Sequence, residues 1–349
     1  LGARTPELAL ANKLVDKVAY EDEYHNAIRT KLKVDKKEKY NIVSITDYAK
    51  TAATSIEDYS KDDIIAVIYA QGEIAGGEGD VNVIGEGSIK RSLQEAREDD
   101  DVKAIVLRVD SPGGNALTSE LIWREIEITK KSKPVVVSMG NYAASGGYYI
   151  AANADRIFAE PNTITGSIGV FGMLPNMTQL GKNIGINAEQ VKTHENASGY
   201  SVFEPIDENF KDFVLESIEK TYATFLKRVA DGRKMKTEEV DAIAQGRVWT
   251  GVDAQKLGLV DEIGGLDDAI KYAAKLGKTT SYRTENFPEY EKSFEDLLAN
   301  FTGMAMFKTK EQLLKEQLGQ EGFQMLEQIK RLKSRKGIQA MMPYEIEIH

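Results

Sequence analysis

Residues 102–114 read V-K-A-I-V-L-R-V-D-S-P-G-G, an almost unbroken apolar run that ends in a Pro-Gly-Gly turn. This pattern is typical of a strand that is buried on both faces of a sheet. Similar strand patterns occupy residues 62–69 and 134–139, and helical patterns occupy residues 88–98 and 118–130. Alternation of apolar strands with helices predicts an α/β fold in which flanking helices cover a mainly parallel sheet.

The composition of the 349-residue chain narrows the class of protein. A hydrophobic content of 42% is enough for a sizeable core, in one large domain or two ordinary ones. The net charge of −10 argues against a general nucleic-acid binder, which would carry a basic surface. Cysteine is absent and the three histidines are scattered, so we expect no disulfide, no metal site and no cofactor. No apolar run reaches the length of a membrane span, and the chain itself is expected to be soluble.

Two short stretches of the sequence resemble each other. Residues 9–18 read A-L-A-N-K-L-V-D-K-V and residues 254–263 read A-Q-K-L-G-L-V-D-E-I, and each is followed by acidic residues and an Ala-Ile pair. Chance agreement between two amphipathic helices is one explanation, and duplication is the other. On the second interpretation, residues 1–35 are the tail end of an upstream repeat, 36–60 a linker and 61–290 a whole copy. The body of the first repeat is then missing from this chain, which begins with Leu rather than Met.

The composition changes near the C-terminus, where residues 291–349 are predicted to form a helical extension. Residues 309–336 form a long, highly charged helical pattern that ends in a cluster of lysines and arginines. A solvated helix end explains this cluster most simply. An oligomer contact and an anionic membrane surface are the alternatives.

Three loops rich in glycine and serine follow three successive strand patterns: S-P-G-G at 111–114, A-S-G-G at 144–147 and T-G-S-I-G at 165–169. Because the carboxyl ends of parallel strands meet at one edge of a sheet, these loops are expected to converge. Ser145 would begin a helix, and the N–H groups of Gly146 and of one residue of the Gly113–Gly114 pair could form an oxyanion hole. Each loop alone is more simply a turn or a close packing contact, but together they favour a site.

A nucleophilic serine needs a base, and the residues offer only weak candidates. His194 lies 49 residues after Ser145, in a polar stretch typical of a surface loop. Lys192 lies in a strand-like piece at 189–193, where an edge lysine usually faces solvent. Asp110 ends a strand, as turn-capping aspartates do. The residues alone therefore do not identify the base that would activate Ser145.

Several motifs in order resemble the signal peptide peptidase A family, also called protease IV. They are the strand ending in S-P-G-G, then Y-A-A-S-G-G-Y-Y-I-A-A, then T-I-T-G-S-I-G-V-F-G, and finally G-R-V-W-T-G-x-x-A-x-x-x-G-L-V-D at 246–261. The likeness covers roughly residues 60–275. It implies a Clp/crotonase-like fold and membership of a group of self-compartmentalising serine proteases.

The resemblance also implies roles for particular residues. The family uses a Ser–Lys dyad, and Ser145 matches its nucleophile, Gly114 and Gly146 its oxyanion glycines, and Ser167 the serine that orients the lysine. In the short form of the family the lysine follows in the same repeat, but the matching stretch here, 195–198, reads E-N-A-S. In the long, tandem-repeat form the lysine comes from the first repeat. The chain is therefore expected to be the serine-bearing half and to be inactive alone.

The resemblance to the long form of the family also implies a location, an oligomeric state and a class of substrate. These are a membrane anchor upstream, a position in the cell envelope facing the periplasm, a homotetramer, and extended apolar peptides such as cleaved signal peptides as substrates. Val170, Phe171 and Met173 are candidates for lining a peptide groove. Three alternatives remain open: a Clp-type hydrolase with a Ser145–His194–Asp arrangement, a crotonase-type acyl-CoA enzyme, and a catalytically silent assembly domain.

Overall fold

The structure is a computed structural model that describes residues 6–19, 21–35, 40–43, 48, 63–194, 197, 200–288 and 339–341. The charged helical pattern expected at 309–336 lies outside these residues. The chain divides into two compact units, Leu1–Asp58 and Tyr59–His349. In the first unit a short helix, α1 (Pro6–Ala11), is followed by the longer α2 (Glu21–Leu32).

The second unit is built on a parallel sheet. Its strands are β1 (Asp63–Gln71), β4 (Val102–Ser111), β6 (Val135–Ala144), β7 (Arg156–Ala159), β10 (Glu262–Ile263) and β11 (Tyr282–Phe287). They lie in the order β10-β7-β6-β4-β1-β11, and each neighbouring pair is parallel. The predicted α/β fold with a mainly parallel sheet is confirmed.

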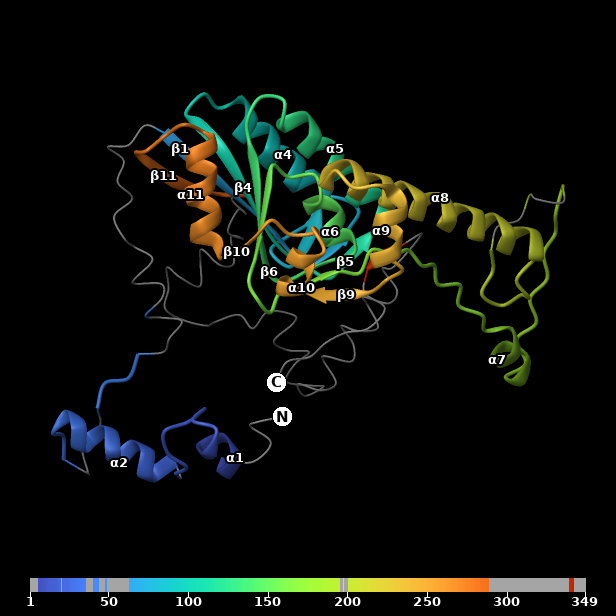
Figure 1. Cartoon of the computed structure of the whole chain (residues 1–349). Helices are drawn as coiled ribbons and strands as arrows, with labels where there is room; N and C mark the ends of the chain where they lie inside the picture. The colour runs from blue at the N-terminus through green and yellow to red at the C-terminus, as the bar shows by residue number, and fades with distance from the viewer. Residues whose placement is uncertain are drawn as a thin grey trace, which may run out of the picture. The chain divides into compact units, whose positions relative to one another are not determined.

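Helices cover both faces of this sheet, as Figure 1 shows. They are α4 (Glu86–Glu98), α5 (Ala116–Thr129) and α6 (Gly146–Ala151) on one side and α11 (Leu266–Leu276) on the other. The alternation of side chains along β1 explains the two cores: Ile64 and Ile68 pack with the first group of helices, and Ile65 and Val67 pack with α11. Both faces are buried, so the strands read as continuous apolar runs.

Shorter strands gather at the carboxyl ends of the main strands. One group is a second sheet in the order β12-β5-β2-β3, formed by β2 (Glu73–Ala75), β3 (Val83–Gly85), β5 (Gly113–Asn115) and β12 (Gln339–Met341). The other consists of β8 (Ile164–Gly166), which extends β6 in parallel, and β9 (Val248–Thr250), which pairs antiparallel with β8. The short helix α10 (Gly251–Lys256) follows β9 directly.

Three helices lie between β8 and β9: α7 (Thr178–Asn183), α8 (Glu208–Arg233) and α9 (Thr237–Ile243). We call α7, the residues that flank it and the amino half of α8 the arm, because this region extends away from the sheet. The carboxyl half of α8 packs on the core through Phe225 and Val229, whereas its amino half extends outward with α7 (Figure 1). The strand expected at 189–193 is wrong: this segment is irregular, and the described structure places no strand beside it with which it could pair. None of the described helices has the length and apolar character that a bilayer span requires.

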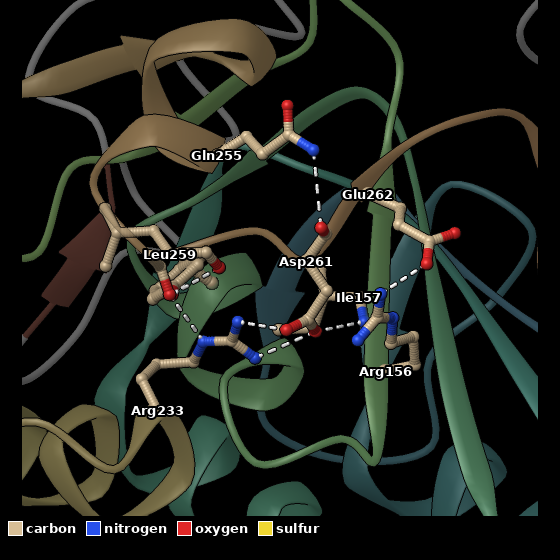
Figure 2. A network of polar contacts seen from close by, with 9 residues as sticks. Arg156, Ile157, Arg233, Gln255, Leu259, Asp261 and Glu262 are labelled. Atoms are coloured by element: carbon tan, nitrogen blue, oxygen red, sulfur yellow. Dashed lines mark hydrogen bonds and ion pairs between the residues drawn. The ribbon is translucent and has the colours of Figure 1, made fainter.

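Charged residues join the end of α8 to the edge of the sheet (Figure 2). Arg233 donates two hydrogen bonds to the carboxylate of Asp261, at 2.7 and 3.1 Å. The same carboxylate accepts a hydrogen bond from the backbone N–H of Ile157 at 2.8 Å. A second ion pair, between Arg156 and Glu262, lies next to the first. The L-V-D motif thus fastens α8 and β10 to the first residues of β7.

Candidate active site

Ser145 occupies the sharp turn between β6 and α6. Its side chain and backbone are fully buried, and its backbone N–H donates to the carbonyl oxygen of Gly166 at 2.8 Å. Its own carbonyl oxygen accepts from the N–H of Tyr149 at 2.8 Å, which starts the helix. The backbone angles of Ser145 are φ +52° and ψ −114°, a conformation that is costly for a residue with a Cβ. Such strain is concentrated at functional sites, so the observation supports a role for this serine.

The glycine pair of β5 has one N–H group already engaged. The N–H of Gly113 donates to the hydroxyl of Ser111 at 3.1 Å. A Cβ on Gly114 would lie 2.0 Å from the carbonyl oxygen of Ile74, and Gly114 also has a φ of +156°. The position therefore accepts only glycine. Since the Gly113 N–H is engaged by Ser111, Gly114 is the candidate of the pair for an oxyanion hole.

The strand β8 brings Ser167 next to Ser145. β8 continues the sheet beside β6, with Gly166 opposite Ala144, so the two serines follow neighbouring strand ends. Ser167 is buried, has a φ of +46°, and donates its N–H to the carbonyl oxygen of Arg247 at 2.7 Å. This agrees with the expectation that the loops after successive strands converge.

The start of α6 fits closely against the end of β4. A Cβ on Gly147 would lie 2.7 Å from the carbonyl oxygen of Ser111, so only glycine permits this approach. α6 also contacts β5, the strand that carries Gly114. The structure thus gathers Ser145, Gly146, Gly114 and Ser167 at one end of the sheet, while their catalytic roles stay predictions.

The candidate bases do not join this group. In the described part of the chain, the Ser145 hydroxyl donates to the carbonyl oxygen of Gly169 at 3.4 Å and to no lysine or histidine. His194 is exposed, with its Nδ1 3.3 Å from the neighbouring hydroxyl of Thr193. Lys192 lines a cavity beside the amino half of α8. Asp110 accepts a hydrogen bond from the N–H of Tyr142 at 3.0 Å, as a strand-end cap does.

One cluster next to the site was missed by the sequence reasoning. The hydroxyl of Tyr149, on α6, donates to Glu120 on α5 at 2.5 Å, and Glu120 is ion-paired with Arg228 on α8. The guanidinium of Arg228 lies 3.7 Å from the centre of the Trp123 ring. Burial and the hydrogen bond to Glu120 raise the pKa of Tyr149, so its proton is retained. The cluster ties α6 to two other helices, and no local pattern connects these positions in the sequence.

Comparisons with known proteins agree with this geometry. Residues 127–280 match peptidase family S49. Protease 4 of Haemophilus influenzae is 44% identical over 239 residues, a match that covers 68% of this chain and 39% of that protein. A protein of Arabidopsis thaliana named "Serine protease SPPA, chloroplastic" is 37% identical over 265 residues, which cover 74% of this chain and 39% of that protein. The chain therefore spans about two fifths of the length of these relatives.

Among solved structures, a ClpP1 mutant from Listeria monocytogenes matches 58% of this chain and 94% of its own, with a TM-score of 0.40 and 16% sequence identity. The family assignment comes from the sequence matches, and the match to the family spans the Ser145 turn, the Ser167 loop and the L-V-D motif. The chain belongs to peptidase family S49, the serine peptidases that include protease 4 and signal peptide peptidase A.

Proposed function

We propose that this chain is the nucleophile-bearing part of a Ser–Lys peptidase that cleaves extended apolar peptides, such as signal peptides after their release. The single observation that carries the proposal is the position of Ser145. It lies in a strained strand-to-helix turn, between the glycine strand β5 and the Ser167 loop. The family assignment supports a peptidase over the acyl-CoA enzyme and the silent assembly domain.

The proposed chemistry uses four groups of this chain, two hydroxyls and two backbone N–H groups. The Ser145 hydroxyl attacks the carbonyl carbon of the scissile peptide bond and loses its proton to a neutral lysine. The N–H groups of Gly114 and Gly146 stabilise the negative oxygen that develops, and the helix dipole of α6 adds to them. The Ser167 hydroxyl orients the lysine. Burial against apolar walls lowers the pKa of such a lysine enough for it to act as a base.

We propose that the lysine comes from a preceding repeat, as in the tandem form of the family. The first unit supports this, because its backbone repeats that of residues 250–279 at a constant spacing. α1 and α10 start at positions 6 and 251, and α2 and α11 start at positions 21 and 266. Left-handed residues recur at the same spacing, with a φ of +58° at Lys13 and +78° at Gly258.

The buried side chains of one copy are exposed in the other. Leu259 is fully buried in the core beneath α8, whereas its counterpart Leu14 is 60% exposed. Val260 and Val15 differ in the same way. The first unit thus carries an apolar surface that, in the second copy, packs on its own sheet. A preceding repeat would supply that sheet and, with it, the catalytic lysine.

The remaining features of the proposal concern the whole protein. We place it in the cell envelope, anchored through an upstream segment and facing the periplasm. We expect a homotetramer, assembled in part through the arm that carries α7. The isolated chain is expected to have little or no peptidase activity, because the base is supplied by another repeat.

Labelling of Ser145 with a fluorophosphonate tests the proposal by intact mass. The 349-residue chain, a longer protein that includes the preceding repeat, and the Ser145→Ala variant of each are compared. We expect labelling of the longer protein alone, and none after Ser145→Ala. Equal labelling of the isolated chain would place the base within it. Peptide cleavage that survives Ser145→Ala would contradict the role of this serine altogether.

A further inference from the structure

The helix that follows Ser145 depends on its neighbours for its position. α6 has only six residues, all of them buried. Isolated helices shorter than about 12 residues are marginal in water, so α6 has little stability of its own. The Ser145 hydroxyl and the Gly146 N–H lie at the start of this helix, and a small rotation of α6 would move both groups. Whatever fixes α6 therefore fixes the geometry of the proposed site.

Two tyrosine hydroxyls are the polar side-chain groups of α6. The Tyr148 hydroxyl donates to the backbone carbonyl oxygen of Leu259 at 2.8 Å. The Tyr149 hydroxyl donates to the Glu120 carboxylate on α5 at 2.5 Å. Tyr149 also donates its backbone N–H to the carbonyl oxygen of Ser145 at 2.8 Å. One residue thus contacts the proposed nucleophile through its backbone and a carboxylate on another helix through its side chain.

Glu120 is itself held in place from a third helix. Its two carboxylate oxygens accept hydrogen bonds from Nε and Nη2 of Arg228 on α8, at 3.2 and 2.5 Å. A two-point contact of this kind fixes the relative orientation of the two side chains. The Arg228 guanidinium lies in turn over the ring of Trp123, which is buried. The Tyr149 ring packs against Phe225 of α8, with 4.6 Å between the ring centres. The acceptor for the Tyr149 hydroxyl is therefore well fixed.

We propose that Tyr149 and Glu120, with Arg228 behind them, form a positioning anchor for the nucleophile turn. This α6 anchor holds the helix in the orientation that aims the Ser145 hydroxyl and the Gly146 N–H at the scissile carbonyl group. Reacting groups must be held to within about 0.5 Å, and supporting hydrogen bonds supply that precision. The role of the anchor in turnover rests on the proposed function, whereas its role in holding the turn does not.

Amide hydrogen exchange in the 349-residue chain tests the anchor without any catalysis. The reporter is the N–H of residue 149, which bonds to Ser145. Its exchange rate is divided by that of Val106, in the centre of β4, so that a change in global stability affects both amides. We expect Tyr149→Phe and Glu120→Gln to raise this ratio by at least about tenfold, because each weakens a hydrogen bond to a charged group and the turn then opens locally.

Glu125→Gln is the matched control for the exchange experiment. Glu125 lies on α5 like Glu120, and it is paired with Arg97 on α4, away from α6. This pair is more buried, with side chains 10% and 19% exposed against 31% and 24% for the pair of Glu120. Its loss should destabilise the chain at least as much and leave the ratio unchanged. A constant ratio in Tyr149→Phe and Glu120→Gln, or an equal rise in Glu125→Gln, would overturn the proposal.

Steady-state kinetics of a longer protein that includes the preceding repeat measure the effect on turnover. With a fluorogenic apolar peptide, we expect Tyr149→Phe to lower kcat by roughly 10- to 100-fold and to leave KM within about twofold, because misplaced reacting groups slow the chemical step and not the binding of the peptide. Glu125→Gln should leave both constants unchanged. A raised KM with an unchanged kcat would contradict the role in turnover. An inactive parent protein would contradict the proposed function instead, and the exchange ratios would still decide whether the anchor holds the turn.

Discussion

Ser145 holds backbone angles that glycine adopts more readily than any other residue. Such a conformation costs about 1–3 kcal/mol, of which glycine would recover most while losing about 0.5–1 kcal/mol through its more flexible unfolded state. We therefore expect Ser145→Gly to be more stable than Ser145→Ala by about 1 kcal/mol, although both lack the proposed nucleophile. Urea denaturation of the two variants, with equal slopes, measures the difference. An alanine variant as stable as the glycine variant would show that no strain is stored in this turn.

At this scale the sequence predicted that Ser145 lies in a tight turn between a strand and a helix, but it did not predict the surroundings of this turn. The small residues on either side of Ser145 indicated a close approach of backbone, and Gly147 against Ser111 shows why. The sequence could not say that the Gly113 N–H is engaged, because that depends on where the Ser111 hydroxyl points. The contact between Tyr149 and Glu120 was equally invisible, since it joins different helices.

At the scale of elements, the Arg233–Asp261 pair joins α8 to the sheet. The side chain of Arg233 is 7% exposed and that of Asp261 is 22% exposed, so Asp261→Asn leaves a largely buried guanidinium without its counter-charge. We expect a loss of about 2–4 kcal/mol in the free energy of unfolding. Glu262→Gln is the matched control, because its pair with Arg156 is more exposed, at 42% and 31%. This change should cost less than about 1 kcal/mol.

A double substitution separates the lost ion pair from other effects of Asp261→Asn. When Arg233→Met is added, no unpaired charge remains, and we expect part of the lost stability to return. Thermal and urea unfolding of the single and double variants measure this coupling. Strictly additive losses would mean that Asp261 and Arg233 are not energetically coupled.

Helices and strands with a strong sequence pattern were predicted within a few residues of their observed bounds. The strand expected at 189–193 was not found, and the reason is informative. The strand expected from residue 102 up to the Pro-Gly-Gly turn corresponds to β4. The helix expected from residue 118 begins at Ala116, because the Asn115 side chain caps it. The segment 189–193 has strand-like composition but lies on the arm, where Val191 is fully exposed. Strand propensity depends on a neighbouring strand, which the sequence of the segment itself cannot supply.

At the scale of the whole molecule, the order of strands could not be read from the sequence. β11 lies beside β1 although the rest of the sheet separates them along the chain, and β12 lies beside β5 in the same way. In a parallel sheet each strand meets its neighbours through long connections, so local patterns carry no information about the order. The convergence of the three loops was predictable only because they follow successive strands.

The arm carries the largest set of exposed apolar side chains in the described part of the second unit. Its exposed members include Met173, Met177, Leu180, Ile184, Phe203 and Phe213. Several large exposed apolar side chains on one region of a protein favour an interface there. We expect the chain to self-associate through the arm, and we expect Phe213→Asp, at a position 63% exposed, to lower the average mass in sedimentation experiments. Val252→Asp, on α10, is the control and should leave the mass unchanged. A parent chain that stays monomeric at all concentrations, or a Phe213→Asp variant that keeps the parent's mass, would contradict assembly through this surface.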